Sequence, residues 1–182
     1  GDCHYLDGNL HAEVKILTTQ ELLDYAGIGR QRLHLRWISS AEGQRFAETV
    51  SELTELVSDL GPLDTEHHRT ALEAALHTLD SENVRWLLGM QRELTEKQNV
   101  YGEKVDSDAY KRLLQETLRN QYQKSLIRLS LREGPLSVRE IDSRINIGTQ
   151  DVASLVLEME NQGQVELHGY EGRTPKFAGT TT

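Results

Sequence analysis

The hydrophobic positions of the first 62 residues change period twice. Over residues 9–27 they recur every three to four positions, which predicts an amphipathic helix ended by a glycine. Residues 33–38 alternate apolar and polar side chains, which predicts a strand. Residues 39–60 return to helical spacing, and Gly61-Pro62 predicts the end of this second helix. The stripe of the second helix comprises Phe46, Val50, Leu53, Val57 and Leu60.

A helix–strand–helix order is typical of α/β folds with a parallel sheet. We therefore predict that residues 1–62 form a truncated, three-layer-type α/β unit. Because a single strand cannot bury two helices, we expect upstream sequence, a partner chain or a dimer to complete it. Ligands of parallel sheets lie outside the carboxyl ends of the strands, which directs attention to the loop at Cys3 and to Ser39 and Ser40.

The remaining chain has a mainly helical pattern. Short apolar stripes over residues 63–109 predict a helical linker. Residues 110–132 predict one long helix rich in Lys and Arg, which is either a solvated basic face or a surface that docks on acidic protein. Two short helices and two strands then follow up to residue 177, the order of a winged helix. We predict that residues 110–178 combine the long helix with a C-terminal winged-helix domain, in a chain that is mainly α overall.

A winged helix raises the question of DNA, and the charges argue against it. The formal net charge is −9, and the candidate recognition helix, residues 150–162, has no Lys or Arg. Arg173 and Lys176 lie near the wing, beside acidic residues. Because DNA affinity comes largely from cations that neutralise phosphates, this pattern favours contact with protein over nucleic acid.

The cysteine count and the lengths of the apolar runs bear on where in the cell the protein is located. A single cysteine excludes an internal disulfide and favours a reducing, cytoplasmic location. Nowhere do about 18 consecutive apolar residues occur, so we expect no membrane span.

Cys3 admits three interpretations. Paired with His4 it would be a catalytic nucleophile, although no third group that would orient the pair is evident. It could equally be a structural cysteine, or one ligand of an iron–sulfur cluster, which usually takes four cysteines. The histidines show no zinc spacing with cysteine, and His67-His68 fits a solvated helix start.

A specific motif opens the chain. Gly1-Asp2-Cys3-His4-Tyr5 precedes Gly8-Asn9, and a Trp-Ile-Ser-x-Ala-Glu-Gly turn follows at residues 37–43. This combination resembles the delta subunit family of methyl-viologen-reducing hydrogenase over roughly residues 1–62. The resemblance implies a [2Fe–2S] cluster in the full-length protein, with Cys3 as a ligand and four residues close to the cluster sulfurs: His4, Tyr5, Ser39 and Ser40. Without further cysteines, no cluster is expected on this chain alone.

The resemblance also implies a function. Delta subunits are non-catalytic and relay electrons between a hydrogenase or formate dehydrogenase and a flavoprotein that resembles the flavin-bearing subunit of heterodisulfide reductase. The winged helix would then be a protein-docking module. Two alternatives are a winged-helix DNA-binding regulator with a ligand-sensing first domain, and a scaffold protein without a cluster.

Overall fold

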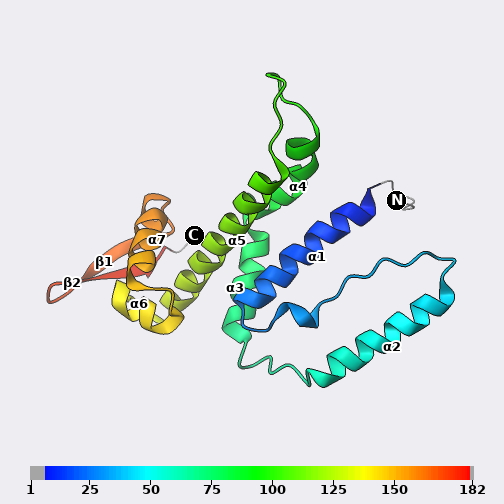
Figure 1. Ribbon diagram of the computed structural model, residues 1–182. Helices are drawn as coiled ribbons and strands as arrows, with labels where there is room; N and C mark the ends of the chain where they lie inside the picture. Colours follow the sequence, from blue (N-terminus) through cyan, green and yellow to red (C-terminus); the bar gives the residue numbers. More distant parts are fainter. Residues whose placement is uncertain (1–6, 181–182) are drawn as a thin grey trace. The chain divides into compact units, whose positions relative to one another are not determined.

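The computed structural model describes residues 7–180 of the chain, which divides after Leu72 into two compact units. The first unit contains α1 (Gly8–Tyr25), the short 3₁₀ helix η1 (Arg30–Arg32) and α2 (Gly43–Asp59), and α3 (Arg69–Asp80) starts at its end. The second unit holds the remaining elements, coloured from green to red in Figure 1: α4 (Glu82–Glu96), α5 (Ser107–Ser130), η2 (Leu131–Glu133), α6 (Val138–Ile145), α7 (Thr149–Asn161), β1 (Val165–Glu171) and β2 (Thr174–Gly179). The described chain is mostly helical, which confirms the mainly α prediction.

The end of α1 follows from its sequence. Gly27 has φ +70°, a left-handed conformation that costs a glycine little and other residues more. The Gly27 amide donates to the carbonyl of Asp24 at 3.0 Å and the Ile28 amide to that of Leu23 at 2.9 Å, so two terminal helix carbonyls are satisfied.

The predicted strand at residues 33–38 is wrong. Leu33 has extended angles, φ −127° and ψ 124°, yet the segment carries no strand ladder. Within residues 7–180, the strands β1 and β2 and an isolated bridge between Leu136 and Phe177 are the only β pairings. An extended segment becomes a strand only when its amides and carbonyls pair with a neighbouring strand, and no strand of the described residues pairs with this one. In the described residues, the predicted α/β unit therefore consists of a helix, an extended segment and a second helix.

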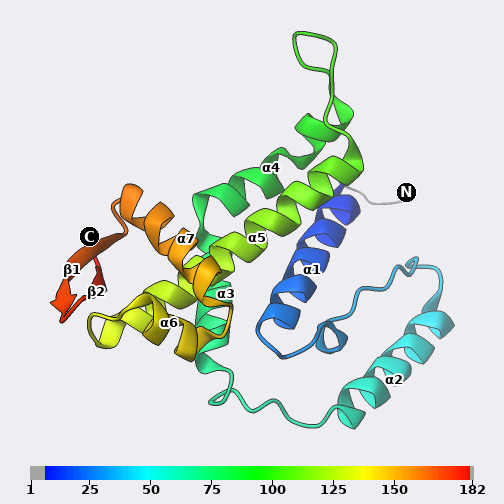
Figure 2. The same ribbon diagram turned by 60° about the vertical axis from the view of Figure 1, so that its left-hand side comes forward.

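The core of the second unit is built around the end of α5. Asp106 caps α5 by accepting the amides of Asp108 at 3.0 Å and Ala109 at 2.9 Å. Both views show α4 running alongside α5 (Figures 1 and 2). The buried apolar cluster then draws on α5, η2, α6, α7 and β1: Ile127, Leu131, Ile141, Val152, Leu155, Val156, Met159 and Val165.

A hairpin closes the chain. β1 and β2 pair antiparallel from Val165 opposite Gly179 to Glu171 opposite Thr174, with an irregularity between Leu167 and Gly169. The Leu136–Phe177 bridge attaches this hairpin to the chain before α6, and Phe177 packs against the core cluster. Among the described residues, none of the helices could serve as a membrane span.

Candidate functional site

An ion pair fixes the turn where α1 gives way to the extended segment. Both carboxylate oxygens of Asp24 accept from Arg30, one from its backbone amide at 2.6 Å and the other from Nε at 2.6 Å. The hydrogen bond from the Arg30 side chain holds the pKa of Asp24 below its ordinary value. Gly29 lies inside this turn at φ +89°, so the sequence Gly27-Ile28-Gly29 is a helix stop and a turn.

The extended segment is anchored at its start. Gln20 of α1 donates from Nε2 to the carbonyl of Leu33 at 2.7 Å. Arg32 donates from Nη1 to the carbonyl of Gly61 and from Nη2 to that of Leu60, each at 2.9 Å. The Leu60 carbonyl is among those that a helix terminus leaves without an intrahelical partner, and Gly61 directly follows it, so Arg32 ties η1 to the end of α2.

Ser39 and Ser40 lie together in the exposed turn before α2. The amide of Ser39 donates to Glu42 Oε2 at 2.8 Å, and the amide of Glu42 donates to the Ser39 carbonyl at 2.9 Å. This amide bond from Ser39, with a further bond from Arg45, holds the pKa of Glu42 below its ordinary value. Because both serines are exposed in this turn, a group outside the described residues can approach them.

The other predicted site residues, Cys3, His4 and Tyr5, lie outside the described residues, so their place beside the two serines stays a prediction. Within residues 7–180, no three His, Cys, Asp or Glu side chains gather in a way that could hold a metal ion. Since the chain has one cysteine, the residues present do not by themselves fit an iron–sulfur cluster, which takes several thiolates.

Sequence reasoning assigned no role to His34. Its Nε2 is buried and has no hydrogen-bond partner among the described residues, the same situation as the hydroxyl of Thr18. Buried polar atoms normally have partners, so both are exceptions. The only sign of this in the sequence is that His34 places one polar ring in the middle of a segment of alternating apolar residues.

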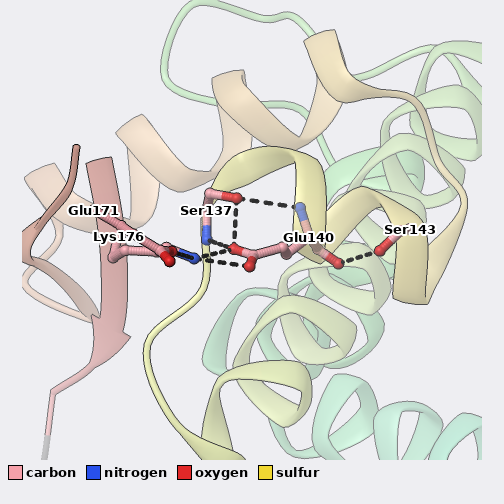
Figure 3. A network of polar contacts seen from close by, with 5 residues as sticks. All are labelled: Ser137, Glu140, Ser143, Glu171 and Lys176. Carbon is pink, nitrogen blue, oxygen red and sulfur yellow. Dashed lines mark hydrogen bonds and ion pairs between the residues drawn. The ribbon is translucent and has the colours of Figure 1, made fainter. Parts of the chain in front are cut away.

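A second group of polar residues joins α6 to the hairpin (Figure 3). The hydroxyl and the amide of Ser137 both donate to Glu140 Oε2, at 2.6 and 2.7 Å, in the capping box that starts α6. Lys176 of β2 donates to both oxygens of Glu140 at 2.7 Å and pairs with Glu171 at 2.8 Å. The bonds from Lys176 and then Ser137 lower the pKa of Glu140 to about 2. The ammonium of Lys176 is thus engaged by two carboxylates.

The helix that follows in this unit presents a neutral to acidic surface. Val152, Leu155, Val156 and Met159 of α7 are buried, whereas Asp151, Ser154 and Glu160 are exposed. Leu157, 58% exposed, lies among these polar residues. Phosphate backbones are bound through cations, and α7 has no Lys or Arg.

A family model matches most of the first unit. Residues 1–61 match the family described as methyl-viologen-reducing hydrogenase, delta subunit, which confirms over these residues the resemblance that the sequence indicated. No solved structure matches the chain.

Curated relatives match a stretch of similar length. The iron-sulfur subunit of the F420-non-reducing hydrogenase of Archaeoglobus profundus is 41% identical over 66 residues, 36% of this chain and 48% of that protein. The corresponding vhu iron-sulfur subunit of Methanocaldococcus jannaschii is 42% identical over 62 residues, 34% of this chain and 46% of that protein. One subunit of the ferredoxin:CoB-CoM heterodisulfide reductase of Methanosarcina mazei is 35% identical over 68 residues, 37% of this chain and 9% of that protein. The matched stretch thus spans less than half the length of these relatives.

Proposed function

We propose that this chain is part of an electron-transfer subunit that works with a hydrogenase or formate dehydrogenase and with a flavoprotein like the flavin-bearing subunit of heterodisulfide reductase. The observation that carries the proposal is the delta-subunit match over residues 1–61, which includes the Asp2-Cys3-His4-Tyr5 motif. Cys3 supplies one thiolate of a [2Fe–2S] cluster, and the other thiolates come from polypeptide outside these 182 residues. His4, Tyr5, Ser39 and Ser40 lie near its sulfurs, where hydrogen bonds tune the potential.

The relatives support the choice of partners. One matched stretch lies in the iron-sulfur subunit of a hydrogenase, and another is a small part of a heterodisulfide reductase chain. The same module therefore occurs both in a hydrogenase and within the reductase. When a module is fused to a protein in one organism and separate in another, a direct association between the separate chains is a natural expectation.

The order of elements in the second unit supports a winged helix with a docking role. A long helix, a bridge, two further helices and a hairpin follow one another from α5 to β2. The exposed face of α7 is neutral to acidic, and Lys176 near the wing is engaged by Glu140 and Glu171. Both features favour a protein partner over DNA.

The test uses the full gene product, reconstituted anaerobically with iron and sulfide. We expect the visible absorption and the EPR signal of a [2Fe–2S] cluster in the reduced protein. After addition of a hydrogenase and the flavin-bearing reductase subunit, we expect hydrogen-dependent reduction of the flavin. Cys3→Ser should remove the cluster signal and the flavin reduction together, because oxygen is a poorer ligand for iron in such clusters.

The control is Ser40→Ala, which keeps every thiolate and should retain the cluster with at most a changed potential. A colourless, iron-free wild-type protein, or a Cys3→Ser variant with the same spectrum as the wild type, refutes the proposal. A salt-sensitive gel shift with duplex DNA at physiological ionic strength would instead favour the regulator.

A further inference from the structure

A polar cavity of about 480 Å³ lies in the second unit, outside the stretch that matches the delta-subunit family. Its lining residues come from the corner between α3 and α4, from α5, and from the turn between α7 and β1. Two of them, Lys124 and Ser125 of α5, are buried, so the packing of α5 fixes part of the wall. A cavity of this volume is large enough for a small molecule.

The cavity brings together charges of opposite sign that do not pair with each other. Asp80 at the end of α3 and Glu82 at the start of α4 are exposed carboxylates that line it, together with Arg128 of α5. Arg128 donates from Nη2 to Gln164 Oε1 at 3.2 Å, and its remaining N–H groups have no partner among residues 7–180. Within the same residues, no ion pair joins Arg128 to Asp80 or Glu82, and neither carboxylate has another partner. The cavity therefore offers one available cation and two available carboxylates.

The other basic side chains of the lining are already engaged. The side chain of Lys124 is only 4% exposed, and its ammonium donates to Glu158 at 2.6 Å. His77 Nε2 faces the guanidinium of Arg132 at 3.4 Å. Arg128 is therefore the cation through which this cavity can hold a ligand.

The chemistry of the lining selects the kind of ligand. A metal ion does not fit, because no three His, Cys, Asp or Glu side chains gather suitably in the described part of the chain. The carboxylates would repel a simple anion, and Arg128 would repel a simple cation. A molecule with both a carboxylate and an ammonium satisfies the two sides, since a guanidinium binds a carboxylate through parallel hydrogen bonds. The carboxamides of Asn83 and Gln121 supply neutral donors and acceptors for the rest of the ligand.

We propose that this cavity binds a free α-amino acid, with its carboxylate on Arg128 and its ammonium on Asp80 and Glu82. The inference does not rest on the electron-transfer role proposed above, because every residue that it uses lies beyond residue 61. Binding should also stabilise the second unit, since a ligand that binds only the folded state shifts the unfolding equilibrium.

The experiment offers the standard L-amino acids one at a time to the intact chain and follows binding by isothermal titration calorimetry. The tightest binder is then compared with two analogues that keep its side chain, one without the ammonium and one without the carboxylate. We expect one-to-one binding of the amino acid. Either analogue should bind at least about tenfold more weakly, because each leaves one charge of the cavity without a partner.

Substitutions that remove single charges locate the site. Arg128→Gln should weaken binding of the amino acid by roughly tenfold or more. Asp80→Asn combined with Glu82→Gln should weaken it similarly, while the analogue without the ammonium should bind no more weakly than it does to the wild type. The control is Arg119→Gln, which removes an exposed arginine of the same helix outside the cavity and should bind as the wild type does. Because all four residues are exposed, circular dichroism should be unchanged in every variant.

Three results would overturn the inference. One is that none of the amino acids binds. Another is that the analogue without the ammonium binds as tightly as the amino acid, since the cavity would then be an anion site. The third is an equal loss of affinity in Arg119→Gln and Arg128→Gln, which would indicate a general attraction by the charge of α5.

Discussion

Removing the carboxylate of Glu158 should destabilise the second unit more than removing the cation it pairs with. Lys124 of α5 donates from Nζ to Glu158 Oε1 of α7 at 2.6 Å. The side chain of Lys124 is only 4% exposed, whereas that of Glu158 is 45% exposed. The ammonium therefore depends on its carboxylate far more than the carboxylate depends on it.

The magnitudes follow from this asymmetry. Breaking a buried pair by removing one partner costs roughly 3–5 kcal/mol, and a hydrogen bond to a charged group contributes roughly 1.5–3 kcal/mol. Because Glu158 is half exposed, water can partly replace it, so Glu158→Ala should cost about 2 kcal/mol. Lys124→Met keeps the buried stem and leaves a carboxylate that water can solvate, so it should cost less than about 1 kcal/mol.

Urea unfolding followed by far-ultraviolet circular dichroism measures both variants. At an m-value of about 2 kcal/mol/M, Glu158→Ala should lower the midpoint for the second unit by about 1 M. The control is Glu93→Ala, which breaks the exposed pair with Lys97 and should change stability by less than about 0.5 kcal/mol. If Lys124→Met destabilises as much as Glu158→Ala, the burial argument is wrong.

The pair also predicts a dependence on pH. The bond from Lys124 is the main cause that lowers the folded pKa of Glu158 below 4.5. The stabilisation is therefore fully present above the unfolded pKa and is lost as pH falls through the folded one. The wild type should lose its advantage over Lys124→Met as the pH is lowered from about 5 into the acid range, and a constant difference would contradict this.

Three further predictions concern the same unit. Ile141→Ala removes a fully buried side chain from the core cluster and should cost roughly 2–5 kcal/mol in urea unfolding, so a loss below about 1 kcal/mol would mean that the core collapses to fill the cavity. Ser137→Ala removes the cap of α6 and should cost about 1 kcal/mol by the same measurement, whereas Ser137→Thr should retain most of it. The pKa of Glu140 is lowered to about 2, chiefly by Lys176, so its stabilising contribution is present above pH 4.5 and disappears towards pH 2. Glu140→Gln should therefore flatten the acid limb of the curve of unfolding free energy against pH. An unchanged acid limb would contradict the network in Figure 3.

The parts of the fold that the sequence predicted well are those determined by near neighbours. The capping box of Ser137 and Glu140 is present as its three-residue spacing indicates. The end of α7 is likewise local, because Gly163 at φ +69° follows the helix as the glycine signal predicts. Each of these depends on residues a few positions apart, so the chain's own sequence is enough.

The strand predicted at residues 33–38 and the helix cap expected at Ser39 depend on more than near neighbours in the sequence. Leu33, Leu35 and Trp37 have the alternation of a strand, but pairing depends on a second segment, which the described residues do not provide. Ser39 and Glu42 have capping-box spacing, yet α2 begins at Gly43 and only the bond from the Ser39 amide to Glu42 forms. The missing half is the one in which the serine hydroxyl would accept an amide of the first turn.

The contacts of the candidate site could not be predicted from the sequence for a similar reason. Arg32 caps the end of α2 from 28 and 29 residues away, and Lys176 reaches Glu140 across 36 residues. Separations of this kind leave no periodic trace in a single sequence. Of the predicted site residues, the structure describes only Ser39 and Ser40. For these two, the sequence predicted only that they lie in the turn after residue 38.

The charges of α7 and the hairpin bear on the partner proposed for the second unit. Proteins that bind a DNA duplex commonly neutralise about six to ten phosphates. From α7 to the end of β2 the chain has two cations, Arg173 and Lys176. Lys176 is 15% exposed and held between Glu140 and Glu171, so a phosphate would have to displace two carboxylates to reach it. One exposed arginine is too little for a duplex, and the exposed Leu157 on the neutral to acidic face of α7 is more compatible with the protein partner proposed above.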